Sequence, residues 1–233
     1  MFDQDDLEQE CIKEYNLGQI SLKIKSKSMH IGVSRSVWKA SLALAQYLNT
    51  NSDNFDVMKE KQLQILELGS GPGLSGFYAS RYFKDSKVFL TDICIKSLNL
   101  IKENIDINKE VLNQNQLSVD FFEWGNFTRS SENEEHYQNK DEFPTNYEGQ
   151  FDLVIASDVV YIPEFLDPLL KSIQYFIKPQ SGRCLLVNNK IRQDLFIDKF
   201  DQMLLENKLD AFVNEEFDMD EDKFRVFIMR LKD

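Results

Sequence analysis

From residue 63 onward, short apolar runs alternate with stretches of helical spacing. The runs have the length of buried strands, and the stretches between them have the length of crossover helices. The expected strands are residues 63–68, 87–92, 116–122, 151–158 and 182–189, and the expected helices are residues 74–83, 95–108 and 164–177. This alternation predicts an α/β fold in which a doubly wound, mainly parallel sheet carries helices on both faces.

Two further apolar stretches, residues 211–217 and 224–231, flank the polar sequence "DMDED" near the C-terminus. They predict an antiparallel hairpin that brings the sheet to seven strands. Upstream, "ISLKIKSK" at residues 20–27 alternates as a half-buried strand does, and "SVWKASLALAQYL" predicts a helix over residues 36–48 with Ser36 as its cap.

The same pattern suggests how the chain is organised. The first 15 residues are polar and acidic, and we expect a frayed helix or a mobile tail there. Residues 1–35 are expected to form an N-terminal tail and strand extension, and residues 36–233 the main domain. Within that domain, residues 129–150 lack an apolar period, so we expect a mobile acidic surface loop.

Composition restricts the partners. The net charge is -12 and no dense basic stripe is present, which argues against nucleic acid and favours a basic protein surface or a small ligand. Three separated cysteines favour a reducing compartment, and two histidines leave little support for a metal site. The sequence has neither a signal-peptide pattern nor an apolar run of membrane-spanning length. We expect a monomer in the cytoplasm, with access to the nucleus left open.

A glycine-rich stretch, "ILELGSGPGLSG" at residues 65–76, follows the first strand of the alternating region. Read from Gly71 it matches the dinucleotide pattern G-x-G-x-x-G, and read from Gly69 it is an acidic-x-G-x-G-x-G pattern. In both readings the backbone can approach a ligand closely at the carboxyl end of the sheet. Glu67 disfavours a pyrophosphate at the helix N-terminus, whereas a cationic cofactor would tolerate it. Asp92, which ends the next strand, can accept hydrogen bonds from ribose in either reading.

Four motifs in order, "LELGSGPGLSG", "VFLTD", "FEWGNF" and "VIASDVVYIPEFLDPLL", resemble class I S-adenosylmethionine-dependent methyltransferases of the seven-β-strand type. More narrowly, they resemble the methyltransferase family 16 group of protein-lysine methyltransferases. The resemblance covers residues 32–190, and its most specific element is the D-x-x-Y sequence from Asp158 to Tyr161. It implies a Rossmann-like methyltransferase fold, S-adenosyl-L-methionine as cofactor and a protein lysine as methyl acceptor. Chaperones, AAA ATPases and translation factors are the substrate classes that it implies.

The resemblance also implies which residues bind the cofactor. The family's glycine loop wraps the methionine part, which falls here on Gly69, Ser70 and Gly71. Glu67 would order that loop or meet the amino group. The family's ribose-binding acid falls on Asp92. A tight strand-to-helix turn without a ligand is the alternative for the glycines.

Four more positions follow from the resemblance. Ile93 is expected to pack against adenine, and Trp124 of "FEWGNF" against the adenine edge. Trp38 is assigned to the floor of the cofactor pocket. Ser157 stands where the family often has Ala, and its hydroxyl could add a hydrogen bond. As alternatives, Trp124 is plain core, and Trp38 anchors the N-terminal helix, alone or in addition.

Methyl transfer is an in-line displacement at carbon, so a protein must supply alignment, exclusion of water and a neutral nucleophile. At the end of its strand, Asp158 is placed to orient an incoming lysine ammonium, and Tyr161 offers it a ring face or hydroxyl. Their i, i+3 spacing brings them together if a helical turn starts there, and Pro163 favours a helix start nearby. Helix capping is the alternative role for Asp158, and packing for Tyr161.

The predicted function is therefore S-adenosylmethionine-dependent methylation of a protein lysine. Three alternatives stay open. No Asn-Pro-Pro-Tyr type element of base or glutamine methylation is present, and the acidic charge disfavours nucleic acid, but methylation of a small molecule stays open as the first alternative. The others are an NAD-dependent oxidoreductase that uses the second glycine register, and a binding module that holds the cofactor without turning it over.

Overall fold

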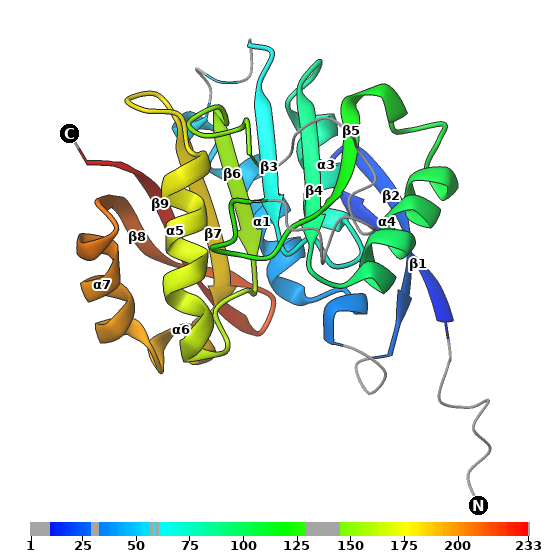
Figure 1. Ribbon diagram of the computed structural model, residues 1–233. Helices are drawn as coiled ribbons and strands as arrows, with labels where there is room; N and C mark the ends of the chain where they lie inside the picture. The colour runs from blue at the N-terminus through cyan, green and yellow to red at the C-terminus, as the bar shows by residue number, and fades with distance from the viewer. Residues whose placement is uncertain (1–9, 29–32, 56–57, 59–60, 129–144, 233) are drawn as a thin grey trace, which may run out of the picture.

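The computed structural model describes residues 10–28, 33–55, 58, 61–128 and 145–232. Its centre is a seven-stranded sheet of order β5-β4-β3-β6-β7-β9-β8 (Figure 1). The parallel strands are β3 (Gln64–Leu68), β4 (Lys87–Asp92), β5 (Leu117–Phe121), β6 (Leu153–Ser157) and β7 (Arg183–Asn189). β8 (Leu209–Met219) and β9 (Asp222–Leu231) complete the sheet as an antiparallel hairpin beside β7. The predicted fold class is confirmed.

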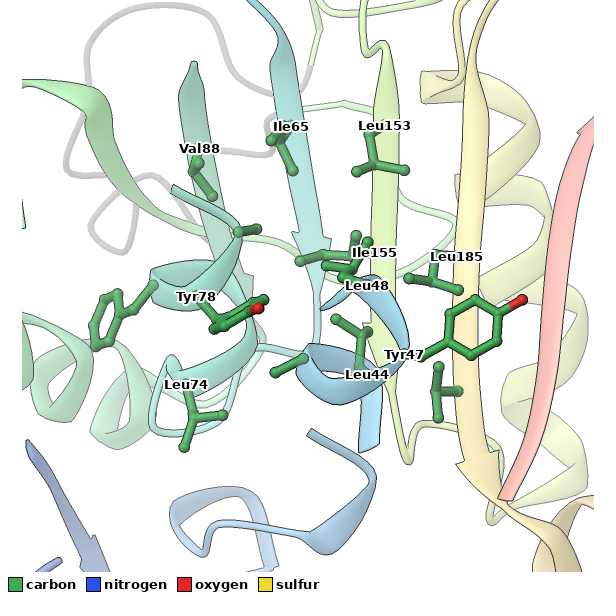
Figure 2. Packing of buried hydrophobic residues seen from close by; sticks show 14 of the residues in the cluster. Leu44, Tyr47, Leu48, Ile65, Leu74, Tyr78, Val88, Leu153, Ile155 and Leu185 are labelled. Atoms are coloured by element: carbon green, nitrogen blue, oxygen red, sulfur yellow. The ribbon is translucent and has the colours of Figure 1, made fainter. Parts of the chain in front are cut away.

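Helices cover both faces of this sheet (Figure 1). They are α1 (Lys39–Thr50), α3 (Leu74–Tyr82), α4 (Ile95–Ile107), α5 (Leu166–Phe176), α6 (Lys190–Asp194) and α7 (Ile197–Glu206). Alternate strand residues point to opposite faces: Ile65 joins the core under α1, α3 and α4, and its neighbour Leu66 joins the core under α5 and α7. Figure 2 shows the first of these cores, with Leu44 and Leu48 of α1 beside Ile155 of β6.

Short 3-10 helices connect several of these elements. They are η3 (Val33–Arg35), η4 (Ser52–Asn54), η5 (Gln114–Gln116) and η7 (Pro163–Phe165). Two of them matter for the site, because η3 precedes α1 and η7 precedes α5 at the carboxyl edge of the sheet. No helix in the described part of the chain is long and apolar enough to cross a membrane.

A second, two-stranded sheet is formed by β1 (Glu10–Leu17) and β2 (Ile20–Lys27). Leu22 and Ile24 of β2 are fully buried in the main core, which confirms the half-buried strand. Residues 10–15 belong to β1, so the expected frayed helix or tail is wrong for them. The alternation in β2 supplies the apolar face that makes this pairing stable. Residues 1–9 lie outside the described residues.

The start of α1 differs from the expectation. The helix begins at Lys39 with Trp38 at its N-cap, and no side chain caps it. Ser36, the expected cap, lies outside the helix, and its hydroxyl donates to the carbonyl of Lys27 (2.9 Å). The serine therefore ties the segment before α1 to the end of β2.

The region between β7 and β8 contains two helices, α6 and α7, that the sequence analysis did not predict. The sequence nevertheless contains a pattern typical of each helix. The Asn189 side chain accepts a hydrogen bond from the Arg192 amide (3.3 Å), as an N-cap does at the start of α6. Ile197, Phe200 and Leu204 recur at helical spacing along α7, with Phe200 and Leu204 buried.

The expected acidic loop is described only at its C-terminal end, residues 145–150. This end packs on the core: the Tyr147 ring stacks on Phe151 (5.7 Å between centroids), and the Tyr175 hydroxyl donates to the carbonyl of Thr145 (3.1 Å). The remaining residues of the predicted loop, 129–144, lie outside the described residues.

Candidate active site

A pocket of about 530 Å³ lies at the carboxyl ends of β3, β4, β5 and β6, beside the segment that leads into α1. All but one of the predicted site residues line it. Those that do are Trp38, Gly69, Ser70, Gly71, Asp92, Ile93, Trp124, Ser157, Asp158 and Tyr161. Residues from five separate segments therefore meet in one cavity, at the edge of a parallel sheet where ligands commonly bind.

The glycine loop forms one wall, and two of its glycines are required by close neighbours. Gly69 has φ 72°, and a Cβ there would lie 3.1 Å from Val159 and 3.2 Å from Trp124. Gly71 has φ 54°, and a Cβ there would lie 3.0 Å from the carbonyl oxygen of Ser34. Larger side chains would be both strained and crowded at these positions. Residues 69–71 line the pocket, and its wall at these two glycines has no room for a larger residue.

Ser70 lies between these two glycines. Its hydroxyl is buried and lies close enough to the Glu67 carboxyl to lower the pKa of that group, although the distance and angle do not complete a hydrogen bond between them. Such a buried polar group is costly unless a ligand or water satisfies it.

Glu67, the remaining predicted site residue, lies beneath the loop and does not line the pocket. Its Oε2 accepts a hydrogen bond from the Gly76 amide in α3 (3.1 Å). Of its two expected roles, this contact corresponds to ordering the loop. Burial raises the pKa of Glu67 to about 8, although the Ser70 hydroxyl and the Gly76 amide both lower it, so the carboxyl is mostly protonated at pH 7. The expected repulsion between Glu67 and a pyrophosphate is accordingly weak.

Asp92 lies at the end of β4 with both carboxylate oxygens bound to backbone amides. Oδ2 accepts from Gly71 (3.0 Å) and Oδ1 from Cys94 (2.8 Å). Burial raises the pKa of Asp92 to about 6, and the amides of Cys94 and Gly71 work in the opposite direction. Each oxygen keeps a further lone pair for a ligand hydroxyl. The adjacent Ile93 side chain is 59% exposed and supplies apolar surface at the pocket wall.

Two tryptophans lie on other walls of the pocket. The Trp38 Nε1 donates to the carbonyl of Val33 (2.9 Å), which fixes its ring at the entry to α1. The half-buried Trp124 ring meets Phe165 edge to face, with 6.3 Å between centroids. Phe165 also lines the pocket and was not among the predicted residues. Together these rings make apolar walls of the size that a flat heterocycle needs.

The segment from Ser157 to Tyr161 closes the pocket after β6. The Ser157 hydroxyl lies 3.2 Å from that of Ser75, so the expected additional hydrogen bond is present. Tyr161 is 42% exposed at the pocket. Residues 158–162 are not helical, because the first turn begins at Pro163 as η7. No helical turn starts at Asp158, so the condition under which the i, i+3 spacing would bring Asp158 and Tyr161 together is not met, and the capping alternative for the Asp158 carboxylate is wrong.

Asp158 has φ 58°, an unusual conformation for a residue with a side chain. Its Oδ1 accepts from the amide of Asn189 (3.2 Å), and its Oδ2 pairs with the guanidinium of Arg192 in α6. Burial raises the pKa of Asp158, and Arg192 opposes that rise. Sequence reasoning did not identify Asn188 or Arg192, because the D-x-x-Y pattern contains no sign of its partners 29 and 34 residues further along the chain.

Comparison with known proteins agrees with this geometry. A lysine methyltransferase family model matches residues 16–206. EEF1A lysine methyltransferase 3 of Xenopus tropicalis is 28% identical over 165 residues, which cover 71% of this chain and 61% of that protein. Protein N-lysine methyltransferase METTL21A of Mus musculus is 25% identical over 180 residues, which cover 77% and 72% of the two chains. The chain thus spans less than two thirds of the Xenopus relative.

Solved structures support the fold. The ribosomal protein L11 methylase of Lactobacillus delbrueckii subsp. bulgaricus superposes with a TM-score of 0.55 at 16% identity, covering 85% of this chain and 81% of that one. A SAM dependent methyltransferase from Aquifex aeolicus gives 0.55 at 12% identity, covering 79% and 93%. At such identities these structures establish a shared Rossmann-like methyltransferase fold alone. With the family match over residues 16–206, the chain belongs to the lysine methyltransferase family.

Proposed function

We propose that the chain is an S-adenosyl-L-methionine-dependent protein methyltransferase that transfers a methyl group to a lysine side chain. One observation carries the proposal: a single pocket joins the glycine loop and Asp92 to the Asp158–Tyr161 segment. The first two suit the cofactor, and the third suits the methyl acceptor. The names of the relatives and the family match support the same activity.

The residues in the pocket fit the cofactor. The backbone from Gly69 to Gly71, which lines the pocket, would hold its amino-acid end. Asp92 would accept hydrogen bonds from the ribose, and Trp124 would lie against the base. When bound, the cofactor supplies a methyl group on a sulfonium centre. The protein contributes alignment and a pocket that excludes water.

The acceptor lysine would enter beside Tyr161 and Asp158. A free lysine has a pKa of about 10.4 and is mostly protonated at neutral pH. Transfer into a less polar pocket favours the neutral amine, which is the nucleophile. Asp158 can accept a hydrogen bond from the incoming amine, and the Tyr161 ring offers a face to its charged form. No covalent intermediate with the protein is needed.

For the protein substrate we propose a translation factor first, because the Xenopus relative is named for EEF1A. Chaperones and AAA ATPases are the next classes to test. We further propose that the enzyme acts as a monomer. Its net charge of -12 favours a substrate with a basic surface around the target lysine.

The direct test uses the full chain with methyl-labelled cofactor in a cell extract, with purified EEF1A as a defined candidate. Label in a protein band, located on lysine by mass spectrometry, is the expected result. Label in the small-molecule fraction alone would favour a metabolite methyltransferase. Titration calorimetry with S-adenosylhomocysteine and with NADH separates the cofactors. Binding of NADH alone contradicts the proposal, and cofactor binding without any label favours a silent binding module.

A further inference from the structure

Arg192 stands behind the proposed acceptor site. Its guanidinium pairs with the carboxylate of Asp158 and lies over the ring of Trp38, 4.9 Å from the ring centroid. Asp158 and Trp38 line the pocket, whereas Arg192 is not among the lining residues. The arginine therefore reaches the site through these two side chains.

The same short helix holds the neighbouring backbone. Asn188 precedes α6 and is fully buried. Its Oδ1 accepts from the amide of Val159 (3.0 Å), and its Nδ2 donates to Gln193 of α6 (2.8 Å). Two consecutive residues of α6 thus hold this segment: Gln193 fixes the backbone after Asp158 through Asn188, and Arg192 fixes the Asp158 carboxylate. Figure 1 places α6 at the end of the sheet toward which the parallel strands point.

We propose that Arg192 is a positioning residue, which sets the direction of the Asp158 carboxylate and keeps it ionised while the acceptor amine binds. This inference rests on the proposed methyl transfer to lysine. Asp158 is 4% exposed and in a left-handed conformation, so its orientation depends on such contacts. Its two oxygens use one bond each for Asn189 and Arg192, which leaves lone pairs for the amine.

The chemistry of the acceptor favours such a pairing. An isolated carboxylate would hold an incoming lysine as the ammonium ion, whereas a carboxylate paired with a guanidinium favours that ion less. The nearby guanidinium itself favours the neutral amine. Asp158 is bound by Arg192 of α6 and by the uncharged Asn189 at the end of β7, and the guanidinium lies over the uncharged Trp38. Arg192 is therefore the charged side chain paired with Asp158 in the described part of the chain.

A matched control lies two residues away on the same helix. Lys190 pairs with Asp194 in α6 and with Glu216 in β8 (3.4 Å). Lys190→Met removes a cation from α6 without touching Asp158. Arg192→Met keeps a long apolar stem beside Trp38 while it removes the guanidinium, and Arg192→Lys keeps a positive charge without the planar fork.

The first experiment needs no activity. The full chain, labelled with carbon-13 at aspartate side-chain carboxyls, is titrated by NMR, and Asp158→Asn identifies the resonance of Asp158. We expect its measured pKa to rise by about one unit or more in Arg192→Met, to rise less in Arg192→Lys and to stay unchanged in Lys190→Met. Identical titration of Asp158 in the wild type and in Arg192→Met would overturn the proposal.

The second experiment uses the protein that the wild type labels in extract. We expect Arg192→Met to lower kcat at least tenfold, with the affinity for S-adenosylhomocysteine within threefold of the wild type. In the Asp158→Asn background Arg192→Met should add little, since both changes act through one carboxylate. Fully additive losses would assign Arg192 a separate structural role. A wild type that labels nothing contradicts the proposed function, and the titration still decides how Asp158 is held.

Discussion

The backbone amide of Gly71 donates a hydrogen bond of 3.0 Å to Oδ2 of Asp92. This contact joins the glycine loop after β3 to the end of the neighbouring strand β4. Asp92 therefore both shapes the loop and faces the pocket. Cofactor affinity and loop order should depend on the same side chain.

Asp92→Asn tests this relationship. The amide side chain keeps one acceptor oxygen, but its NH₂ group faces one of the two backbone amides that Asp92 now satisfies. We expect the affinity for S-adenosylhomocysteine to fall at least tenfold. Leaving one amide unsatisfied should lower the free energy of unfolding by about 1–3 kcal/mol. Calorimetry and urea denaturation measure the two effects.

Asp120→Asn is the control for that change. Asp120 is also buried and does not line the pocket. It belongs to the adjacent strand β5, where it pairs with Thr91 of β4. Its substitution should affect stability and leave cofactor affinity near the wild-type value. Equal loss of affinity in both variants would mean that Asp92 acts through general stability alone.

Glu67→Gln should change how stability depends on pH. The folded-state pKa of about 8 lies above the ordinary value of 4.5, so the folded protein holds a proton that the unfolded chain loses between these values. The contribution of Glu67 to stability is therefore complete below about pH 4.5 and falls as the pH rises toward 8. Gln cannot ionise, and its amide oxygen can still accept from Gly76.

Relative to the wild type, we expect Glu67→Gln to gain stability with rising pH, by at most about 1.4 kcal/mol per pH unit over that window. Urea denaturation at a series of pH values between 5 and 8.5 gives the difference directly. A difference between the two proteins that is constant over this range would contradict the raised pKa.

Asp158→Asn separates the acceptor role from cofactor binding. Asn tolerates the left-handed conformation of this residue better than Ala, so the change mainly removes charge. We expect S-adenosylhomocysteine to bind within about threefold of the wild type and methyl transfer to fall by a factor on the order of 100, within the range typical of general acid–base groups. Unchanged turnover on a labelled protein substrate would remove Asp158 from the mechanism.

Much of this architecture could be predicted from the sequence, because strands and helices repeat with clear periods after residue 63. Pocket residues such as Gly69, Asp92 and Tyr161 lie at the ends of predicted strands or up to three residues beyond them. The carboxyl ends of parallel strands meet at one edge of the sheet, so such residues come together there. Glu67 is the one predicted site residue that does not line the pocket. It belongs to the motif, yet as a strand residue one position before the end of β3 it points into the interior.

The unpredicted parts have a different physical origin. The position of Arg192 depends on how α6 packs after β7, a contact between residues 34 positions apart in sequence, and no local period encodes it. Strand β1 was not predicted because none of its residues is buried: it is held by pairing with β2 and by ion pairs such as Lys25–Glu10. A mostly exposed strand lacks the alternation that sequence reasoning relies on.

Asn104 of α4 joins this hairpin to the glycine loop. It is fully buried, exchanges two hydrogen bonds with the backbone of Lys25 (2.7 and 2.9 Å) and donates a third to the carbonyl of Pro72 (2.9 Å). Asn104→Leu removes all three. At about 0.5–1.5 kcal/mol for each bond, we expect the free energy of unfolding to fall by roughly 2–4 kcal/mol. The affinity for S-adenosylhomocysteine should fall as well, because Pro72 lines the pocket.

Asn108 provides the matched comparison one helical turn further along. Its side chain holds the backbone of Lys23 in β2 in the same way, by bonds of 2.9 and 2.7 Å, but its third bond goes to the carbonyl of Asn104 (2.7 Å) and, within the described residues, none goes to the glycine loop. Asn108→Leu should therefore destabilise the protein to a similar extent in urea while the affinity of the folded protein for S-adenosylhomocysteine is retained. If both variants lose affinity equally, the hairpin supports the pocket as a whole and the Asn104–Pro72 bond has no separate effect on the glycine loop.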